Sequence, residues 1–342
     1  MVLPPVTATP VPIPAASPAG TATSATAAST TPAPAALMPA TPSPGQLLQT
    51  ALTAARLEAA TMQNGLATLM ANVLRATASG NLPSAVQSAM QQLIALHLPT
   101  DKAPDAAAVK NAMLASGLFT EAMLAAGLAP ADLKSALGQL QQAAQRWLAQ
   151  TPANQQQPNA SAPNVPPPVR GGAPMAQSPA QPSLPENADP ALTAKLLANG
   201  SEAALARESL LQMASLPDQN KPGETRWIFD VPLMTPQGAA VGQMIITRDH
   251  KGSSPDAPEP VWRVGLAINI EPLGPVRANL ALSGDHAWVT IGADRPESLE
   301  KLSRNSSWLT DALTAVTLDA DIAFQSGAGV SRPYGSLVDS AS

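Results

Sequence analysis

Two of the three histidines directly follow an aspartate, and these pairs are the residues most able to do acid–base chemistry. The pairs are Asp249-His250 and Asp285-His286. A carboxylate beside an imidazole can orient that ring as a general base. Both pairs fall in predicted turns, however, where polar side chains are typically solvated. The chain has no cysteine, and no serine stands in a Gly-x-Ser-x-Gly elbow. The sequence therefore predicts no enzyme, and catalysis by these pairs stays a hypothesis that requires them to converge in a pocket.

The other polar residues predict no metal or cofactor site. Asp319 and Asp321 share one side of a predicted strand, but two carboxylates on a short strand are typical of a solvated face. The spacing of the histidines matches no metal-ligand motif, and no glycine-containing stretch matches a phosphate-binding loop. We therefore expect the protein to work without a cofactor.

Charge and hydropathy exclude two classes of partner. The chain of 342 residues carries 19 Lys and Arg against 24 Asp and Glu, a formal net charge of −5. This balance leaves no basic surface for nucleic acid. No run of 18 apolar residues predicts a membrane span, and Met1 to Pro5 lack the basic start of a signal peptide. We expect a monomer that neither binds nucleic acid nor inserts into a membrane.

Proline-rich and helix-forming segments alternate before residue 188. Residues 1–45 hold 11 prolines and no charged side chain, a composition that predicts disorder. Residues 46–150 are rich in Ala and Gln and carry apolar residues at steps of three and four, which predicts helices. Their small side chains bury little area, so we expect marginal helices with little core. Residues 151–187 form a proline-rich linker.

A pair of short helices is predicted over residues 188–216. Asp189 suits the cap position before the first helix, and Pro190 suits its first turn. Glycine has a low helix propensity, so Gly200 should end this helix. Ser201 would then cap the second helix.

From Thr225 the period of apolar residues changes from 3.6 to 2, which predicts strands with one buried face each. Seven of the nine aromatic residues also lie after residue 225, so the large core side chains gather there. Trp227 and Trp262 share the phase of their apolar neighbours, which favours core packing over an exposed binding row. The predicted strands cover residues 227–233, 241–248, 262–270, 276–282 and 286–292.

A helix and a last strand complete this region. Asp294 is suited to cap the helix, Pro296 to its first turn and Glu297 to a capping box. Residues 318–324 then form a strand. The order predicts an α+β fold over residues 225–326, an antiparallel-rich sheet with one packed helix, followed by a disordered tail over 327–342.

One block of this C-terminal region resembles a known family. The block reads IEPLGPVRANLAL over residues 270–282, WVTI over 288–291 and DRPESLE over 294–300, with spaced leucines over 309–318. It resembles the C-terminal domain of bacterial flagellar hook-length control proteins, the FliK family, which place a similar Pro, Leu and Gly motif before a strand hairpin.

The resemblance implies a secreted molecular ruler that stops hook growth and switches type III export from hook to filament substrates. It further implies that the protein is made in the bacterial cytoplasm and exported through the flagellar apparatus. The implied partners are the cytoplasmic domain of the export-gate switch protein (FlhB type) and, for the N-terminal region, hook and hook-cap subunits. Within the motif, Glu271, Pro272, Leu273 and Gly274 are the candidate partner-binding residues. These four could equally do no more than shape a turn.

A second hypothesis shares the disorder but not the flagellar role. A long flexible arm in front of one compact domain is also typical of a non-enzymatic interaction or scaffold module. Neighbouring hook and rod genes would favour the first hypothesis, and an isolated gene would favour the second.

Overall fold

The computed structural model describes six stretches of the chain. They are residues 43–80, 82–100, 104–152, 165–218, 223–249 and 260–327. The chain divides into two units, residues 1–46 and 47–342, and only residues 43–46 of the first unit are described. The disorder predicted for 1–45 and for 327–342 therefore falls almost wholly outside the described residues.

Helices fill most of the described chain before residue 216. They are α1 (Pro44–Met62), α2 (Leu66–Ser79), α3 (Ser84–Ala95), α4 (Ala106–Leu114), α5 (Thr120–Ala125), α6 (Leu133–Gln150) and α7 (Pro190–Ser215). The predicted cap is confirmed, because the Asp189 carboxylate accepts a hydrogen bond from the Leu192 amide at 2.7 Å.

Gly200 does not end a helix, so the prediction of two short helices is wrong. A Cβ atom at Gly200 would lie 2.9 Å from Cδ1 of Leu69, which belongs to α2. The glycine thus lets α7 and α2 approach closely, and this packing offsets the low helix propensity of glycine. Ser201, which the sequence assigned to a cap, is buried and donates to the Leu197 carbonyl.

The strands form one sheet whose order follows the chain. They are β1 (Leu98–Pro99), β2 (Glu224–Thr235), β3 (Gly238–Asp249), β4 (Trp262–Ile270), β5 (Gly274–Ser283), β6 (His286–Ala293) and β7 (Asp319–Ser326). Neighbours from β2 to β6 pair antiparallel, while β1 with β2 and β6 with β7 pair parallel. The α+β fold with an antiparallel-rich sheet is confirmed.

The single helix predicted between the last two strands is a pair. α8 (Pro296–Arg304) and α9 (Ser306–Thr314) meet at Asn305, which ends the first and caps the second. The cap residue of α8 is Arg295, so the assignment of that position to Asp294 is wrong. Arg295 has another use, described below.

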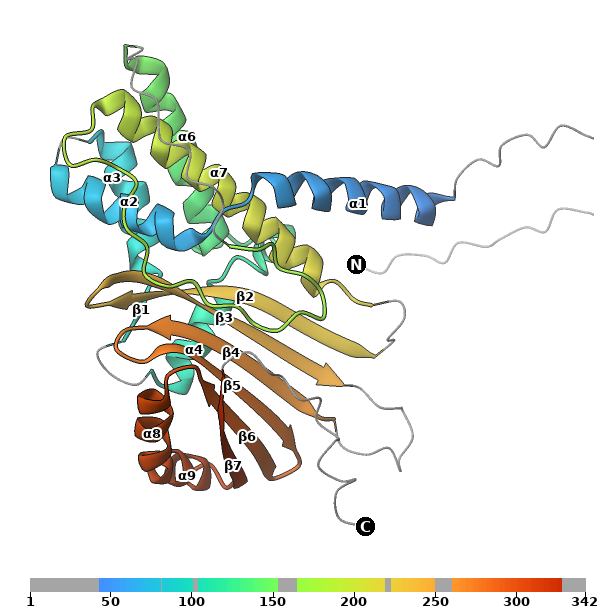
Figure 1. Ribbon diagram of the computed structural model, residues 1–342. Helices are drawn as coiled ribbons and strands as arrows, with labels where there is room; N and C mark the ends of the chain where they lie inside the picture. The colour runs from blue at the N-terminus through green and yellow to red at the C-terminus, as the bar shows by residue number, and fades with distance from the viewer. Residues whose placement is uncertain are drawn as a thin grey trace, which may run out of the picture. The chain divides into compact units, whose positions relative to one another are not determined.

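The two faces of the sheet have different coverings. α2 and α7 lie against one face over β2 and β3, and we call this the bundle face (Figure 1). α4, α8 and α9 pack on the other face, which we call the apolar face. On β2, Ile228 and Asp230 point to the bundle face and Phe229 to the apolar face, and all three are buried. The expectation of one buried face is therefore wrong for β2.

α2, α3, α6 and α7 share a well-packed core, so the expectation of helices with little core does not hold for them. Its fully buried members include Met70 of α2, Leu93 of α3, Leu137 of α6 and Leu197 of α7. Val241 of β3 joins the same cluster, which fastens the helices to the sheet. α1 differs, because most of its length is exposed.

Residues 165–188, called the strap below, run between the helices and the sheet. Gln177 pairs with Val241 of β3 through two backbone hydrogen bonds of 2.8 and 3.0 Å. The buried Leu184 donates its amide to the Asn72 side chain of α2 at 2.9 Å. The second half of the predicted linker is thus a packed element, and residues 153–164 lie outside the described residues.

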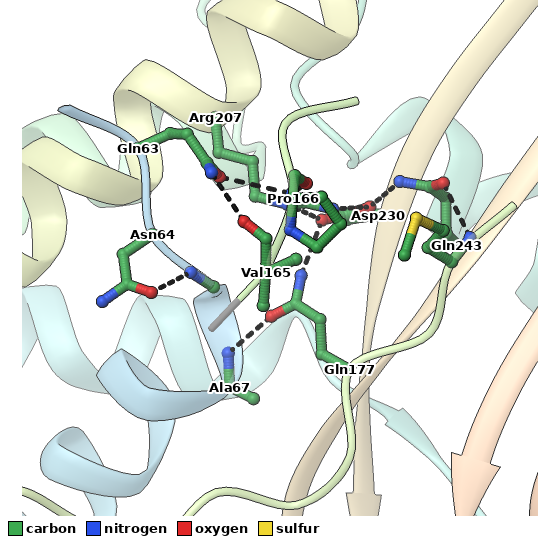
Figure 2. Close-up of polar contacts among 11 residues, drawn as sticks. Gln63, Asn64, Ala67, Val165, Pro166, Gln177, Arg207, Asp230 and Gln243 are labelled. Atoms are coloured by element: carbon green, nitrogen blue, oxygen red, sulfur yellow. Dashed lines mark hydrogen bonds and ion pairs between the residues drawn. The ribbon is translucent and has the colours of Figure 1, made fainter. Parts of the chain in front are cut away.

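A buried polar cluster joins the strap, the helices and the sheet around Asp230 (Figure 2). Arg207 of α7 forms an ion pair with Asp230 of β2, with Nε 2.6 Å from Oδ2. The side-chain amides of Gln243 on β3 and Gln177 on the strap also donate to Asp230, at 2.8 and 3.1 Å. The carboxylate is therefore fully satisfied without water.

The far side of Arg207 holds the start of the helical region. Its guanidinium donates to the Gln63 side chain at 3.4 Å and to the Pro166 carbonyl at 3.3 Å. Gln63 in turn donates to the Val165 carbonyl at 2.7 Å (Figure 2). One ion pair thus ties together α7, the sheet, the strap and the segment between α1 and α2.

Glu208, next to Arg207, makes stability depend on pH. Burial raises the pKa of this carboxyl well above its usual range, and the charge of Asp230 adds to the effect, while Arg207 and Lys134 oppose it. A carboxyl whose pKa is raised by folding stabilises the fold below its unfolded pKa, about 4.3. That contribution is lost as the pH rises toward the folded pKa. Glu208→Gln should therefore gain free energy of unfolding relative to wild type as the pH rises above about 4.3.

Urea unfolding of wild type and Glu208→Gln between pH 4 and 8 measures this difference. Glu202→Gln is the matched control, because Glu202 lies on the same helix but is exposed. If the difference in free energy of unfolding between wild type and Glu208→Gln stays constant across the pH range, the raised pKa of Glu208 is contradicted.

Candidate partner-binding turn

The four candidate residues comprise the turn that joins β4 to β5 and, at Gly274, the first residue of β5. Gly274 adopts φ +70°, a left-handed conformation that favours glycine. A Cβ atom there would lie 2.6 Å from Nε of Arg295. The glycine is thus required by the backbone and by the side chain that crosses it. The Glu271–Pro272 peptide bond of the turn is cis.

Arg295 closes this turn from the start of α8. Its guanidinium forms two hydrogen bonds of 2.6 Å with the Glu271 carboxylate and a third of 2.9 Å with the Pro272 carbonyl. The hydrogen bonds from Arg295 lower the pKa of Glu271, and those to Glu271 raise the pKa of Arg295. Ser298 of α8 adds a hydrogen bond to the Leu273 carbonyl at 2.8 Å. The turn is therefore held to α8 at three of its four residues.

Exposure separates the turn into a surface part and a packed part. Glu271 and Pro272 are exposed, Leu273 is half-buried and Gly274 is buried. A partner could thus contact the first two residues, while Gly274 sets their conformation. Sequence reasoning missed Arg295, because the Asp-Arg-Pro-Glu pattern was assigned only to capping of the following helix.

The two His–Asp pairs do not form a common site in the described residues. Asp249 forms an ion pair with Arg263, and His250 lies outside the described residues. His286 lies 3.3 Å from Asp319 and 3.1 Å from Asp321, which confirms that these two carboxylates share a side of their strand. Asp249 is the last residue of β3 and His286 is the first of β6. These strands are three places apart in the sheet, which is about 14 Å at the usual strand spacing.

The tryptophans predicted to be core residues stack on each other at one end of the sheet. The rings of Trp227 and Trp262 lie 6.3 Å apart between centroids and are nearly parallel, at 14°. Both side chains are only partly buried. The guanidinium of Arg248 covers the ring of Trp262 at 5.1 Å, a cation–π contact.

Two clefts open on the apolar face on either side of Met244 and Leu266. One, of about 430 Å³, lies between the sheet and α4, and the other, of about 460 Å³, lies between the sheet and α8 and α9. Neither is lined by a charged side chain. Trp308 stands at the edge of the second and is 64% exposed.

The described residues show no group of three His, Asp or Glu that could hold a metal ion. None of the helices in the same stretches is both long and apolar enough to cross a membrane.

Comparison with known proteins gives one match. Residues 251–332 match the family model described as flagellar hook-length control protein FliK. This segment contains the turn, its Arg295 clamp and the strands and helices that follow. No curated protein and no solved structure matches the chain. Over its C-terminal domain, the chain resembles the flagellar hook-length control proteins of the FliK family.

Proposed function

We propose that the protein controls the length of the flagellar hook and switches the export apparatus from hook to filament substrates. The observation that carries this proposal is the family match over residues 251–332. The composition agrees with export in an unfolded state, because the chain has no cysteine and its first 45 residues carry no charge. As a ruler, residues 1–215 would reach about 700 Å if fully extended.

The turn at Glu271–Gly274 is the surface that we assign to the cytoplasmic domain of the export-gate switch protein. Two features support this assignment: the turn lies within the matched segment, and Glu271 and Pro272 are exposed on an ordered backbone. We assign hook and hook-cap subunits to the N-terminal region. The protein would act in the cytoplasm first and then leave through the flagellar type III channel, working as a monomer without catalysis.

Electron microscopy of hooks from cells that lack the gene tests the function. The expected result is abnormally long hooks without filaments, because neither hook growth nor hook export would stop. Normal hooks that carry filaments would reject the proposal and leave a shared fold only. The chain would then be an interaction module with a flexible arm.

Gly274→Ala tests the turn in cells complemented with variants. The added methyl group would displace Arg295 from Glu271, and the left-handed φ costs about 1 kcal/mol more. Hooks should become longer and more variable in length. Gly80→Ala is the matched control, because Gly80 has φ +74° but open space around its Cβ position.

Far-ultraviolet circular dichroism of both purified variants checks that the fold persists. Wild-type hook lengths with Gly274→Ala would show that the turn has no part in length control. Equal defects in both variants would trace the effect to backbone strain alone.

A further inference from the structure

Three arginines from three strands line one cleft on the bundle face. They are Arg226 of β2, Arg263 of β4 and Arg277 of β5. The cleft has a volume of about 420 Å³, and residues 171–174 of the strap form its wall. Register places the side chains on one face, because Arg226 and Arg263 both pair with Thr247, and Arg277 pairs with Ala267, which lies four residues along β4 from Arg263.

The positive charge of this cleft is only partly neutralised within the described residues. Arg263 forms an ion pair with Asp249, and the charges of Glu224 and Asp294 act on Arg226 and Arg277 respectively. Arg226 donates one hydrogen bond to the Gly172 carbonyl at 3.1 Å, and its buried Nε has no hydrogen-bond partner.

Burial makes these two cations receptive to an anion. It lowers the pKa of Arg226 against the opposing charge of Glu224, with a further contribution from the like charge of Arg170, and it also lowers the pKa of Arg277. Both directions report guanidinium groups that have lost solvation without gaining a full counter-charge. An anion in the cleft would supply that charge, in a chain whose net charge of −5 makes a basic pocket exceptional.

An exposed tryptophan extends the same face. Trp288 of β6 pairs with Ala281, which pairs with Arg263, so Trp288 stands two strands, about 10 Å, from the arginine. Trp288 is 40% exposed, and its ring lies in an edge-to-face arrangement with that of His286, 4.3 Å apart between centroids. Tryptophan and arginine are the residues that most often dominate the energy of protein interfaces.

We propose that the arginine cleft and Trp288 bind an acidic peptide segment of a protein partner. A carboxylate of that segment enters the cleft between Arg226 and Arg277, since a guanidinium can hold a carboxylate through two parallel hydrogen bonds. An apolar side chain of the same segment packs on Trp288, about 10 Å from Arg263 of the cleft. Asp321, beside Trp288 on the next strand, disfavours a second carboxylate there and so sets the direction of the peptide. This interface is separate from the turn at Glu271–Gly274.

Fluorescence anisotropy with the full chain tests the proposal. The probe is a fluorescein-labelled peptide, Glu-Glu-Ser-Ser-Leu, which when extended spaces its apolar side chain about 10 Å from a carboxylate. The comparison peptide replaces both Glu with Gln. We expect the Glu peptide to bind at least about tenfold tighter, and its binding to weaken as salt is raised from 50 to 200 mM.

Variants locate the binding. Arg277→Gln should weaken binding of the Glu peptide at least about tenfold, and Trp288→Ala should weaken both peptides. Arg304→Gln is the control, because Arg304 is exposed on α8 and outside the cleft. Thermal unfolding of each variant is the folding control: a midpoint equal to that of wild type excludes a folding defect.

Three results would overturn the proposal. The first is equal binding of the Glu and Gln peptides, or binding of neither. The second is unchanged binding by Arg277→Gln. The third is a site that binds phosphate but not the peptide. Sodium phosphate would then shift the NMR signals of the Arg226 and Arg277 amides, and added peptide would not reverse the shifts. That result would indicate a small-anion site instead.

Discussion

Asp230→Ala is expected to lower the free energy of unfolding by about 3–5 kcal/mol, because it leaves the buried guanidinium of Arg207 without its counter-charge. Arg207 and Asp230 are each 1% exposed, so water cannot replace the lost partner. Gln177 and Gln243 lose an acceptor at the same time. Urea unfolding followed by circular dichroism measures the loss, and a loss below about 1 kcal/mol would contradict it.

Two controls make this result specific to burial. Glu186→Ala breaks the pair between Glu186 and Arg75, whose side chains are 83% and 33% exposed, and should cost about 1 kcal/mol or less. The double variant Arg207→Met with Asp230→Leu removes both charges. It should be more stable than Asp230→Ala alone, since no unpaired charge stays buried.

Leu137→Ala is expected to cost about 2–5 kcal/mol, the usual range for a leucine removed from a tight core. Leu137 of α6 is fully buried in the cluster that joins the helices to Val241 of β3. If these helices and the sheet unfold as one unit, circular dichroism and tryptophan fluorescence should report the same transition. The thermal midpoint should fall by the same amount with both probes.

The same substitution on α1 provides the control. Leu48 is 59% exposed, so Leu48→Ala should change stability by no more than about 0.5 kcal/mol. Equal effects of the two substitutions would mean that the helices contribute no core. Two separate transitions for Leu137→Ala would mean that the helices and the sheet unfold independently.

The strands could be predicted from sequence because their side chains alternate strictly. Val264, Leu266 and Ile268 of β4 point to one face, and no insertion interrupts the period. The cap at Asp189 was predicted for a similar local reason. In each case the conformation depends on a residue and its immediate neighbours.

The Asp230 cluster could not be predicted because its members are far apart in sequence. Gln63, Gln177 and Arg207 meet only after the helices have packed on the sheet. The alternation in β2 predicted only one buried face, because a strand alone cannot show that its second face is covered. The arginine cleft was missed for this reason too. One signal for a buried carboxylate was present in the sequence, because Asp230 stands between the apolar residues Phe229 and Val231 of β2.

Packing also reversed two local preferences. Gly200 is unfavourable in a helix by about 1 kcal/mol relative to Ala, yet α7 continues through it because Leu69 occupies the space of the missing side chain. Alanine-rich helices looked too small to form a core. Their partner surfaces are contributed mainly by other helices that are distant in sequence, with Ala239 and Val241 of β3, so sequence alone does not reveal them.

The strap has a consequence for the kinetics of folding. The contacts that position it join residues about 100 positions apart, such as Gln63 with Val165 and Asn72 with Leu184. Chains with such a high contact order fold slowly, since large loops must close before the contacts that stabilise them can form. A newly made chain would therefore spend longer without the strap contacts that join the helices to the sheet.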